Sequence, residues 1–365
     1  MFNRFSRFHE EVGCDVARVR ISDVAAAAGV STATVSLVLN DRTARISEVT
    51  ADRVRRAAAE VGYTPNSVAR GLRTQRSHTV GMISDRIATT PFAGRMLAGA
   101  QDVAREHGYL VFLVDTEADE TVEREAIRAL ADQQVDAMIY ACMWHRVVDV
   151  PSSLPRGTVF LDCRPTDGGF PAVVPDDRAG GVEAVRALVA AGHRRIAYVD
   201  VDEPHPPVAS YLRHEGYLQV LAEAGIAPDP ALHVRGDTSS AGGRQATDRL
   251  LDLPEEQRPT ALFCFNDRMA AGAYVAAHRR GLVIPQDLSI VGYDDQQLVA
   301  ADLDPPLTTV ALPHYEMGRW AMEVALGIRT PDDPCAPHLM PCPIVDRDSV
   351  GPPPATAASD SRRRT

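Results

Sequence analysis

Apolar residues recur three and four positions apart between residues 21 and 40, on both sides of Gly29. This spacing predicts two short helices whose apolar faces are buried together. The buried positions are Val24, Ala28, Val30, Val35 and Val38, with Ala25 kept small where the second helix crosses close above it. Ser22 and Ser31 are expected to cap the two helices, and Gly29 supplies the left-handed residue that ends the first. The pattern predicts a helix-turn-helix.

The outward face of the second predicted helix is short and carries no acid, as a helix lying against DNA phosphates requires. Its residues are Ser31, Thr32, Ala33, Ser36, Leu37 and Asn40. Ser47 or Thr50 is expected to cap a third helix in the segment ADRVRRAAAEVGY. A helical hairpin at the edge of a domain would show the same alanine-rich pattern, so these helices alone leave both interpretations open.

From residue 78 onward, buried strands alternate with amphipathic helices. The first run has strands at 79–84, 109–115, 136–141 and 158–162, with helices near 92–107 and 120–133. A second run follows residue 176, with strands at 195–200, 232–236, 260–265 and 288–293, and helices to 191 and near 208–224, 241–253 and 267–280. Two such runs predict two doubly wound parallel sheets facing each other across a cleft. The late elements at 308–312, 313–326 and 341–346 are expected to return to the first lobe and cross again.

These patterns predict five segments. They are a disordered extension at 1–18, a helix-turn-helix headpiece at 19–64, a hinge linker at 65–78, a two-lobed effector-binding and dimerisation domain at 79–350, and a disordered tail at 351–365. The extension has no apolar run of signal-peptide length, and no segment reaches the roughly 20 apolar residues of a membrane span. We therefore expect a cytoplasmic protein that binds no membrane.

Charge is distributed unevenly along the chain. The net charge of −11 alone argues against a nucleic-acid partner, but residues 20–76 hold nine arginines against five acidic residues, leaving −15 for the remainder. A basic head on an acidic body is typical of a DNA-binding protein that does not bind DNA through its body. The six cysteines form no CxxC and no zinc spacing, so we expect no metal or cofactor and mostly buried thiols.

The headpiece resembles the LacI/GalR (lactose-repressor) family of bacterial transcription regulators. The resemblance rests on the motifs Asp23-Val24-Ala25, Ala28-Gly29-Val30-Ser31, Thr34-Val35-Ser36, Leu39-Asn40, Gly62-Tyr63, Pro65-Asn66, Ala69-Arg70 and Leu72. The body resembles the same family at Gly192–Ala197, Asn266–Ala270, Ile290–Asp295 and Pro306–Thr309. Because these motifs are far more specific than a generic helix-turn-helix, they favour the DNA-binding interpretation.

The resemblance implies an all-α headpiece joined to a periplasmic-binding-protein-like body with three crossovers. It implies a homodimeric repressor that binds a pseudo-palindromic double-stranded DNA operator and is controlled by a small effector, expected to be a sugar, with a nucleoside or other metabolite as the alternative. The expected DNA contacts are Ser22, Ser31, Thr32, Ala33, Thr34, Ser36, Leu37, Asn40, Ser47, Thr50, Asn66, Ala69 and Leu72, the last as a minor-groove wedge in the hinge.

Ligands of parallel sheets bind beyond the carboxyl ends of the strands, where this chain carries polar residues. The resemblance assigns effector binding to Arg213, Asn266 and Asp294, and Asp162 is expected to join them. The alternative is that strand-end Asp and Asn residues only cap helices, which is what we expect of Asp267 and Asp295. The family's stacking aromatic is replaced here by Thr238, so Phe92, Trp144 or His314 is expected to take its place.

The sequence disfavours two other classes of function. An enzyme is disfavoured because the chain has no GxSxG, P-loop or HExxH motif, and we expect no catalytic residue. A plain solute-binding protein is disfavoured by the headpiece and by the absence of a signal peptide. The sequence predicts a ligand-responsive transcription regulator, without identifying the effector or the operator.

Overall fold

The computed structural model describes residues 19–40, 43, 46–63, 76–87, 90, 93–333 and 336–354. These residues belong to two compact units, Met1–Ser77 and His78–Thr365. Several predictions lie outside the described residues. They are the extension at 1–18, most of the hinge and of the tail, and the site residues Asn66, Ala69, Leu72 and Phe92.

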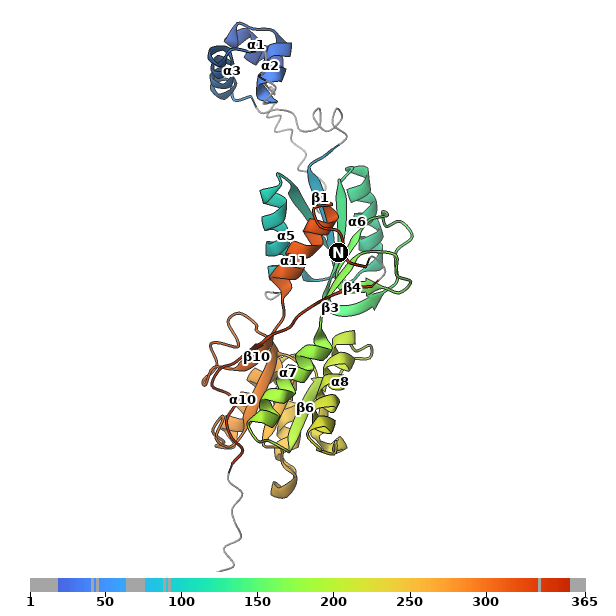
Figure 1. Cartoon of the computed structure of the whole chain (residues 1–365), viewed down its shortest axis with the longest axis vertical. Helices are drawn as coiled ribbons and strands as arrows, with labels where there is room; N and C mark the ends of the chain where they lie inside the picture. The colour runs from blue at the N-terminus through green and yellow to red at the C-terminus, as the bar shows by residue number, and fades with distance from the viewer. Residues whose placement is uncertain are drawn as a thin grey trace, which may run out of the picture. The chain divides into compact units, whose positions relative to one another are not determined.

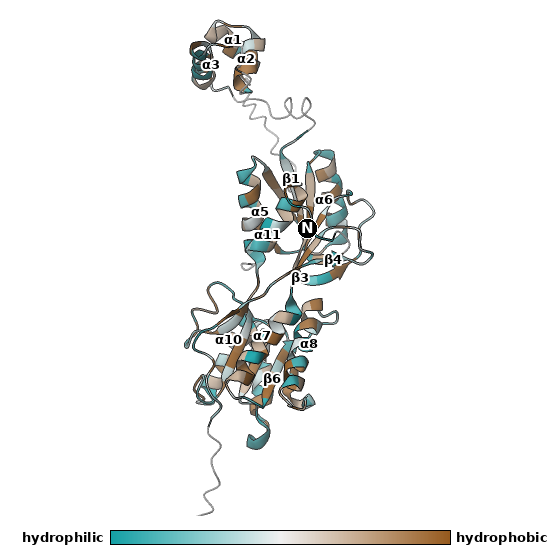
Figure 2. Cartoon of the chain, viewed as in Figure 1, coloured by the Kyte–Doolittle hydropathy of each residue, from teal (hydrophilic) through white to brown (hydrophobic). Residues whose placement is uncertain are grey.

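The first unit contains three helices, α1 (Ile21–Ala28), α2 (Thr32–Leu39) and α3 (Glu48–Glu60). Gly29 has a φ of 61° and ends α1 as expected, and Ser31 caps α2 by accepting a hydrogen bond from the Thr34 amide. Ser47 caps α3. Apolar side chains from all three helices form one small core, and α3 turns a strongly hydrophilic face outward (Figure 2).

The predicted cap of α1 was wrong. Its N-cap is Arg20, whose amide donates to the Asp23 carboxylate over 2.7 Å, and Ser22 lies inside the first turn. The Asp23 carboxylate accepts a hydrogen bond from the Arg20 backbone amide, so this amide has a partner without a serine cap. The helix therefore begins at Ile21, two residues earlier than a cap at Ser22 would allow.

The first lobe of the second unit is built on a six-stranded parallel sheet (Figure 1). Its order is β11 (His338–Met340), β5 (Ala172–Pro175), β4 (Val159–Pro165), β3 (Ala137–Val148), β1 (Thr79–Ser84) and β2 (Leu110–Asp115). Helices α5 (Gly94–Glu106) and α11 (His314–Ala325) share one hydrophobic cluster with the sheet, and α6 (Glu120–Asp132) joins a second one.

The second lobe repeats this architecture. Its sheet has the order β12 (Ile344–Val345), β10 (Thr308–Ala311), β9 (Ser289–Asp294), β8 (Ala261–Cys264), β6 (Ile196–Val201) and β7 (His233–Gly236), and only β12 is antiparallel to its neighbour. Helices α9 (Ser240–Leu251) and α10 (Asp267–Arg279) cover one face, while α7 (Asp177–Ala190) and α8 (Val208–Glu223) cover the other. Two short 3₁₀ helices, η2 (Pro230–Leu232) and η3 (Glu255–Gln257), complete it.

The chain passes between the two lobes three times, as expected. It enters the second lobe after β5, returns to the first for α11 and β11, and ends in the second with β12. α11 is fixed to the first lobe by a close crossing with α5, since a Cβ at Gly318 would lie 2.0 Å from the Met96 carbonyl oxygen. Sequences distant in the chain thus share each core.

Within the described part of the chain, no single helix is long and apolar enough to cross a membrane. Helices α1 and α2 reach that length and apolarity only together, and they are bent by 102° at the turn between them. Four cysteines of the described residues are buried as free thiols: Cys142, Cys163, Cys264 and Cys342.

Candidate functional site

The exposed face of α2 has the neutral character predicted for it. Ser31, Thr32 and Ala33 are exposed at its start, and Leu37 is 42% exposed one turn further on. The helix contains no acidic and no basic residue. Short neutral side chains let a helix approach the edges of base pairs without repelling phosphates.

Most of the other predicted headpiece residues form hydrogen bonds at the ends of α2 and α3. Ser31 and Thr34 share a hydroxyl hydrogen bond of 2.9 Å, and Ser47 and Thr50 repeat this arrangement at α3. Ser36 and Asn40 are half-buried, and the Asn40 amide donates to the Ser36 carbonyl. Ser22 is exposed at the start of α1.

A pocket in the second unit is lined by residues of both lobes. Its walls combine apolar side chains with a small number of polar ones, as in other ligand sites. The lining residues are Met143, Trp144, His145, Asp162, Pro175, Ala209, Arg213, Asp294 and Leu312. Four of the six predicted effector residues, Trp144, Asp162, Arg213 and Asp294, are therefore brought together.

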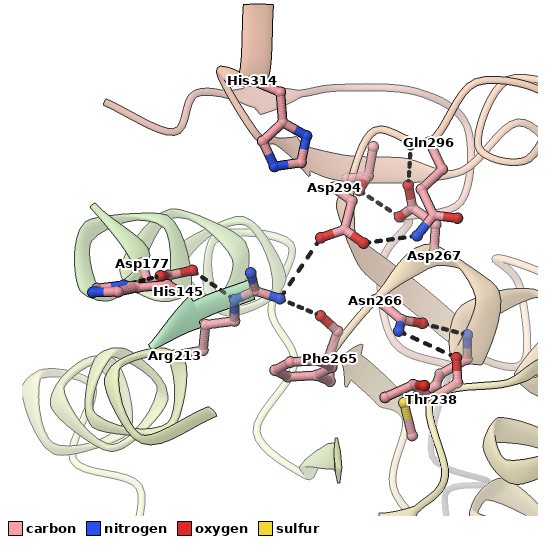
Figure 3. Close-up of polar contacts among 12 residues, drawn as sticks. His145, Asp177, Arg213, Thr238, Phe265, Asn266, Asp267, Asp294, Gln296 and His314 are labelled. Carbon is pink, nitrogen blue, oxygen red and sulfur yellow. Dashed lines mark hydrogen bonds and ion pairs between the residues drawn. The ribbon is translucent and has the colours of Figure 1, made fainter. Parts of the chain in front are cut away.

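Arg213 is the central polar residue of the pocket (Figure 3). It is 2% exposed, and its Nε donates to Asp177 Oδ1 over 2.9 Å. Its Nη1 donates a hydrogen bond of 2.6 Å to the Phe265 carbonyl and lies 3.8 Å from Asp294 Oδ1. The guanidinium also lies over the Tyr293 ring, 3.5 Å from its centroid. These contacts fix the planar group in one orientation.

Asp177 and His145 extend this arrangement across the pocket. Asp177 begins α7 in the second lobe, and its Oδ2 lies 2.8 Å from Nδ1 of His145, on the first-lobe strand β3. Burial raises the pKa of Asp177, but Arg213 and His145 together lower it by more than burial raises it. The pKa of Asp177 therefore lies below its usual value. Asp177 is thus a buried carboxylate with two partners.

Asp162 and Asp294 are the acidic residues that the two sheets contribute to the pocket; Asp294 ends β9, whereas Asp162 lies within β4. Both have positive φ, 55° and 106°, a conformation that residues other than glycine adopt at a cost and that clusters at functional sites. Burial raises the pKa of Asp162 well above its usual value, and burial raises the pKa of Asp294 to about 6 despite nearby Arg213. Gln296 donates to Asp294 Oδ2 over 2.7 Å.

Asn266 does not line the pocket. Its Oδ1 caps α10 by accepting from the Met269 amide, and its Nδ2 donates to the Thr238 carbonyl. Both polar atoms of the Asn266 side chain are thus hydrogen-bonded to backbone groups. Asp267, which was expected to cap, is instead fully buried and accepts from the Thr309 hydroxyl and the Gln296 amide.

Asp295 also caps no helix, because its carboxylate pairs with Arg347 over 2.7 Å. Of the expected aromatic replacements, Trp144 lines the pocket and stacks on Phe265 with 5.9 Å between ring centroids. His314 lies near it, with Nε2 3.9 Å from Asp162 Oδ2.

His145 and Asp177 were not predicted from the sequence. His145 lies at the end of a strand that continues seven residues past the predicted Ala141. Asp177 directly follows Asp176, the cap of α7, and was not recognised as the buried partner of Arg213. An unexplained second acid at a helix start was the available signal. Among the described residues, no group of three His, Cys, Asp or Glu side chains could hold a metal ion.

Comparisons with known proteins agree with this arrangement. Residues 20–66 match the model of bacterial regulatory proteins, lacI family, and residues 185–350 match the periplasmic binding protein-like domain. The chain is 36% identical over 334 residues to the HTH-type transcriptional repressor CytR of Escherichia coli (strain K12), covering 90% of this chain and 96% of that protein.

Two solved structures resemble the chain along most of its length. The lac repressor dimer bound to operator and the anti-inducer ONPF matches with a TM-score of 0.75 and 27% identity, covering 91% of this chain and 99% of that one. The complex of the transcriptional regulator CelR with cellobiose matches with a TM-score of 0.63 and 29% identity, covering 91% and 100%.

Proposed function

Because the chain belongs to the lacI family of bacterial regulatory proteins, we propose that the exposed face of α2 reads operator DNA and that the pocket around Arg213 binds the controlling effector. The protein is a DNA-binding transcriptional repressor whose operator affinity depends on a small ligand. The observation that carries the assignment of sites is the joining, in one chain, of a neutral helix-turn-helix face to a buried polar pocket.

The DNA-binding proposal starts from the residues exposed on α2. Thr32, Ala33 and Leu37 offer methyl groups and one hydroxyl, so base contacts rest on thymine methyls and close fit more than on bidentate pairing with guanine. Arg20, exposed just before α1, supplies positive charge for the phosphates. A homodimer would present two such faces to a pseudo-palindromic operator, as the lac repressor dimer does to its own. Its action on DNA places it in the cytoplasm.

The walls of the pocket combine apolar and polar side chains, which suit the two kinds of surface of a small polar ligand. Apolar Trp144 and Leu312 suit the ring of a sugar or a nucleoside base, while Arg213 and Asp294 suit hydroxyl groups. CelR, of similar structure, was solved with cellobiose. Arg213, Asp177 and His145 are linked to one another and to no nucleophile among the described residues, so we propose that the pocket binds and releases its ligand unchanged.

The α2 proposal is tested by a matched pair of substitutions. Selection from random double-stranded DNA first identifies the operator of the full chain. Ala33→Glu places an acid on the proposed reading face, and Ala59→Glu places the same acid on the exposed side of α3. In gel shifts, Ala33→Glu should abolish operator binding, while Ala59→Glu should retain most of it. Equal binding by both variants would contradict the assignment of α2.

A further inference from the structure

Strand β3 bulges where it reaches the pocket. Its pairing with β4 is regular up to Ala141 and resumes at Arg146, and in this interval β3 advances five residues while β4 advances two. A bulge of this kind bends the strand and re-aims side chains next to a binding site. Three residues of the bulge line the pocket: Met143, Trp144 and His145.

The bulge is fixed to the first lobe on both sides of Trp144 and His145. Asp85, which follows β1, accepts a hydrogen bond of 2.9 Å from the Met143 amide, and its Oδ2 lies 3.7 Å from Nη2 of Arg146. One carboxylate thus holds the residue before the pair and the residue after it. Trp144 and His145 are therefore presented from a fixed segment of backbone.

Trp144 and His145 both contact the second lobe (Figure 3 shows His145). Trp144 stacks on Phe265 with 5.9 Å between ring centroids and packs against the hydrophobic cluster of that lobe. His145 Nδ1 donates to Asp177 Oδ2 over 2.8 Å, and both of these side chains are buried. Two consecutive residues of the first lobe thus join the second lobe through one apolar and one polar contact.

Arg213 holds the second-lobe partners of both contacts. Its Nε donates to Asp177 Oδ1 over 2.9 Å, and its Nη1 donates to the Phe265 carbonyl over 2.6 Å. The guanidinium also lies 4.6 Å from the centroid of the Phe265 ring. Both halves of the contact between the lobes are therefore fixed by protein groups alone, and a ligand is not needed to assemble it.

We propose that the β3 bulge is a latch that holds the two lobes closed over the pocket before a ligand binds, with Arg213 as the positioning residue for its second-lobe partners. The inference deepens the proposed function, on which it rests for the assignment of the pocket to the effector. A latched pocket is preorganised, because a ligand does not have to form the closing contacts itself. The latch must open before a ligand can enter.

The test measures how often the pocket opens, through the reactivity of one thiol on its wall. Ala209→Cys places this thiol on α8, at a pocket-lining position that is 2% exposed. Cys14→Ser and Cys335→Ser remove two thiols outside the described residues, and the same chain without Ala209→Cys gives the background from the buried native thiols. The full chain is labelled with a disulfide reagent, without ligand or DNA. When opening and closing are faster than labelling, the labelling rate is proportional to the open fraction.

Substitutions at residue 145 then weaken or keep the latch. His145→Leu removes the donor to Asp177 and should raise the labelling rate about tenfold, as expected for one lost hydrogen bond to a charged group. His145→Asn keeps an N–H donor close to the place of Nδ1 and should label near the parent rate. His193→Leu is the matched control, because His193 is also buried and its hydrogen bonds to Thr260 and Ser289 lie within the second lobe. It should leave the labelling rate unchanged.

Each outcome decides for or against the latch. A parent thiol that reacts as fast as in the urea-unfolded chain overturns the inference, because the lobes are then open. Equal rates in the parent and His145→Leu overturn it, and so does an equal rise in His145→Leu and His193→Leu, which indicates general loosening. If thermal unfolding shows that His145→Leu is not folded, Phe265→Leu, which removes the stacking partner of Trp144, should raise the rate instead.

Gel shifts of the wild type on the selected operator separate this inference from the proposed function. Loss of sequence-specific DNA binding refutes the proposed function, whereas the labelling rates still decide whether the bulge holds the lobes closed. Intact operator binding together with unprotected labelling refutes only the latch.

Discussion

Removing the Arg213 side chain should destabilise the effector domain as well as impair the effector response. The arginine is 2% exposed and is the cationic partner of Asp177, which is fully buried. The variant Arg213→Met keeps much of the apolar stem but removes the charged guanidinium, and with it the contact over the Tyr293 ring. Asp177 would then retain only His145 as a partner. The perturbation therefore leaves a buried carboxylate with half of its compensation.

The size of this effect follows from the contacts that are lost. Removing one partner of a buried ion pair costs about 3–5 kcal/mol, because the other charge stays buried. The Phe265 carbonyl also loses its donor, a contact of about 1–3 kcal/mol that overlaps with the first and is not added to it. At about 2–4 °C per kcal/mol, the domain should melt about 6–20 °C below the wild type.

The assay is thermal unfolding of the full chain, followed by circular dichroism, for wild type, Arg213→Met, Asp177→Asn and the double variant. The double variant removes the unpaired carboxylate at residue 177, while Asp294 lacks Arg213 in both variants, so the double variant should recover at least half of the stability lost in Arg213→Met. A single variant Arg213→Met that melts with the wild type would refute the buried-pair reasoning. A double variant as unstable as the sum of the singles would show that the two residues act independently.

The remaining four predictions each concern another residue of the chain. Burial raises the pKa of Asp294 to about 6, so the protonated carboxyl stabilises the folded state. This stabilisation is fully present below the unfolded pKa near 4 and is lost as pH rises through 6. Between pH 5 and 7.5, the free energy of unfolding in urea titrations should fall by about 1–2 kcal/mol more for the wild type than for Asp294→Asn. Gly318→Ala should destabilise the first lobe by about 1–3 kcal/mol in the same titration, because its Cβ would meet the Met96 carbonyl oxygen. Leu37→Arg should move the selected operator toward a G·C pair at one symmetric position, and identical consensus sites would contradict base reading there. Ser31→Ala should destabilise the headpiece by about 1 kcal/mol in thermal unfolding of residues 19–63, since α2 loses its cap.

The elements that could be predicted from the sequence are those with a local signal. Gly29 and Ser31 mark the turn of the headpiece through their own conformation and hydrogen bonds, and the long buried strands stand out between amphipathic helices. β5 and β11 were not predicted. Each has only three or four residues, and they form a strand pair with each other although they are far apart in the chain. Such short strands exist only through tertiary pairing.

The same distinction holds in the pocket. Asp162, Asp294 and Arg213 were predicted because strand ends and family motifs mark them, and the structure places all three around the pocket. Asp177 was not predicted, because its partners lie 32 and 36 positions away in the chain. Asn266 was expected in the pocket but serves as a helix cap, the alternative that its strand-end position also allowed. Residue type alone did not separate these two roles.

Two buried pocket atoms without a hydrogen-bond partner among the described residues, His145 Nε2 and Asp162 Oδ1, bear on how the pocket controls DNA binding. An effector changes operator affinity only through its differential affinity for two arrangements of the protein, and the operator must change effector affinity by the same factor. His145 Nε2 and Asp162 Oδ1 belong to first-lobe strands, whereas Arg213 and Asp294 belong to the second lobe. A ligand that bonds to both sets gains its full binding energy only when the lobes are this close. Its hydroxyls therefore stabilise one arrangement of the lobes selectively, which is the condition for any effect on the operator.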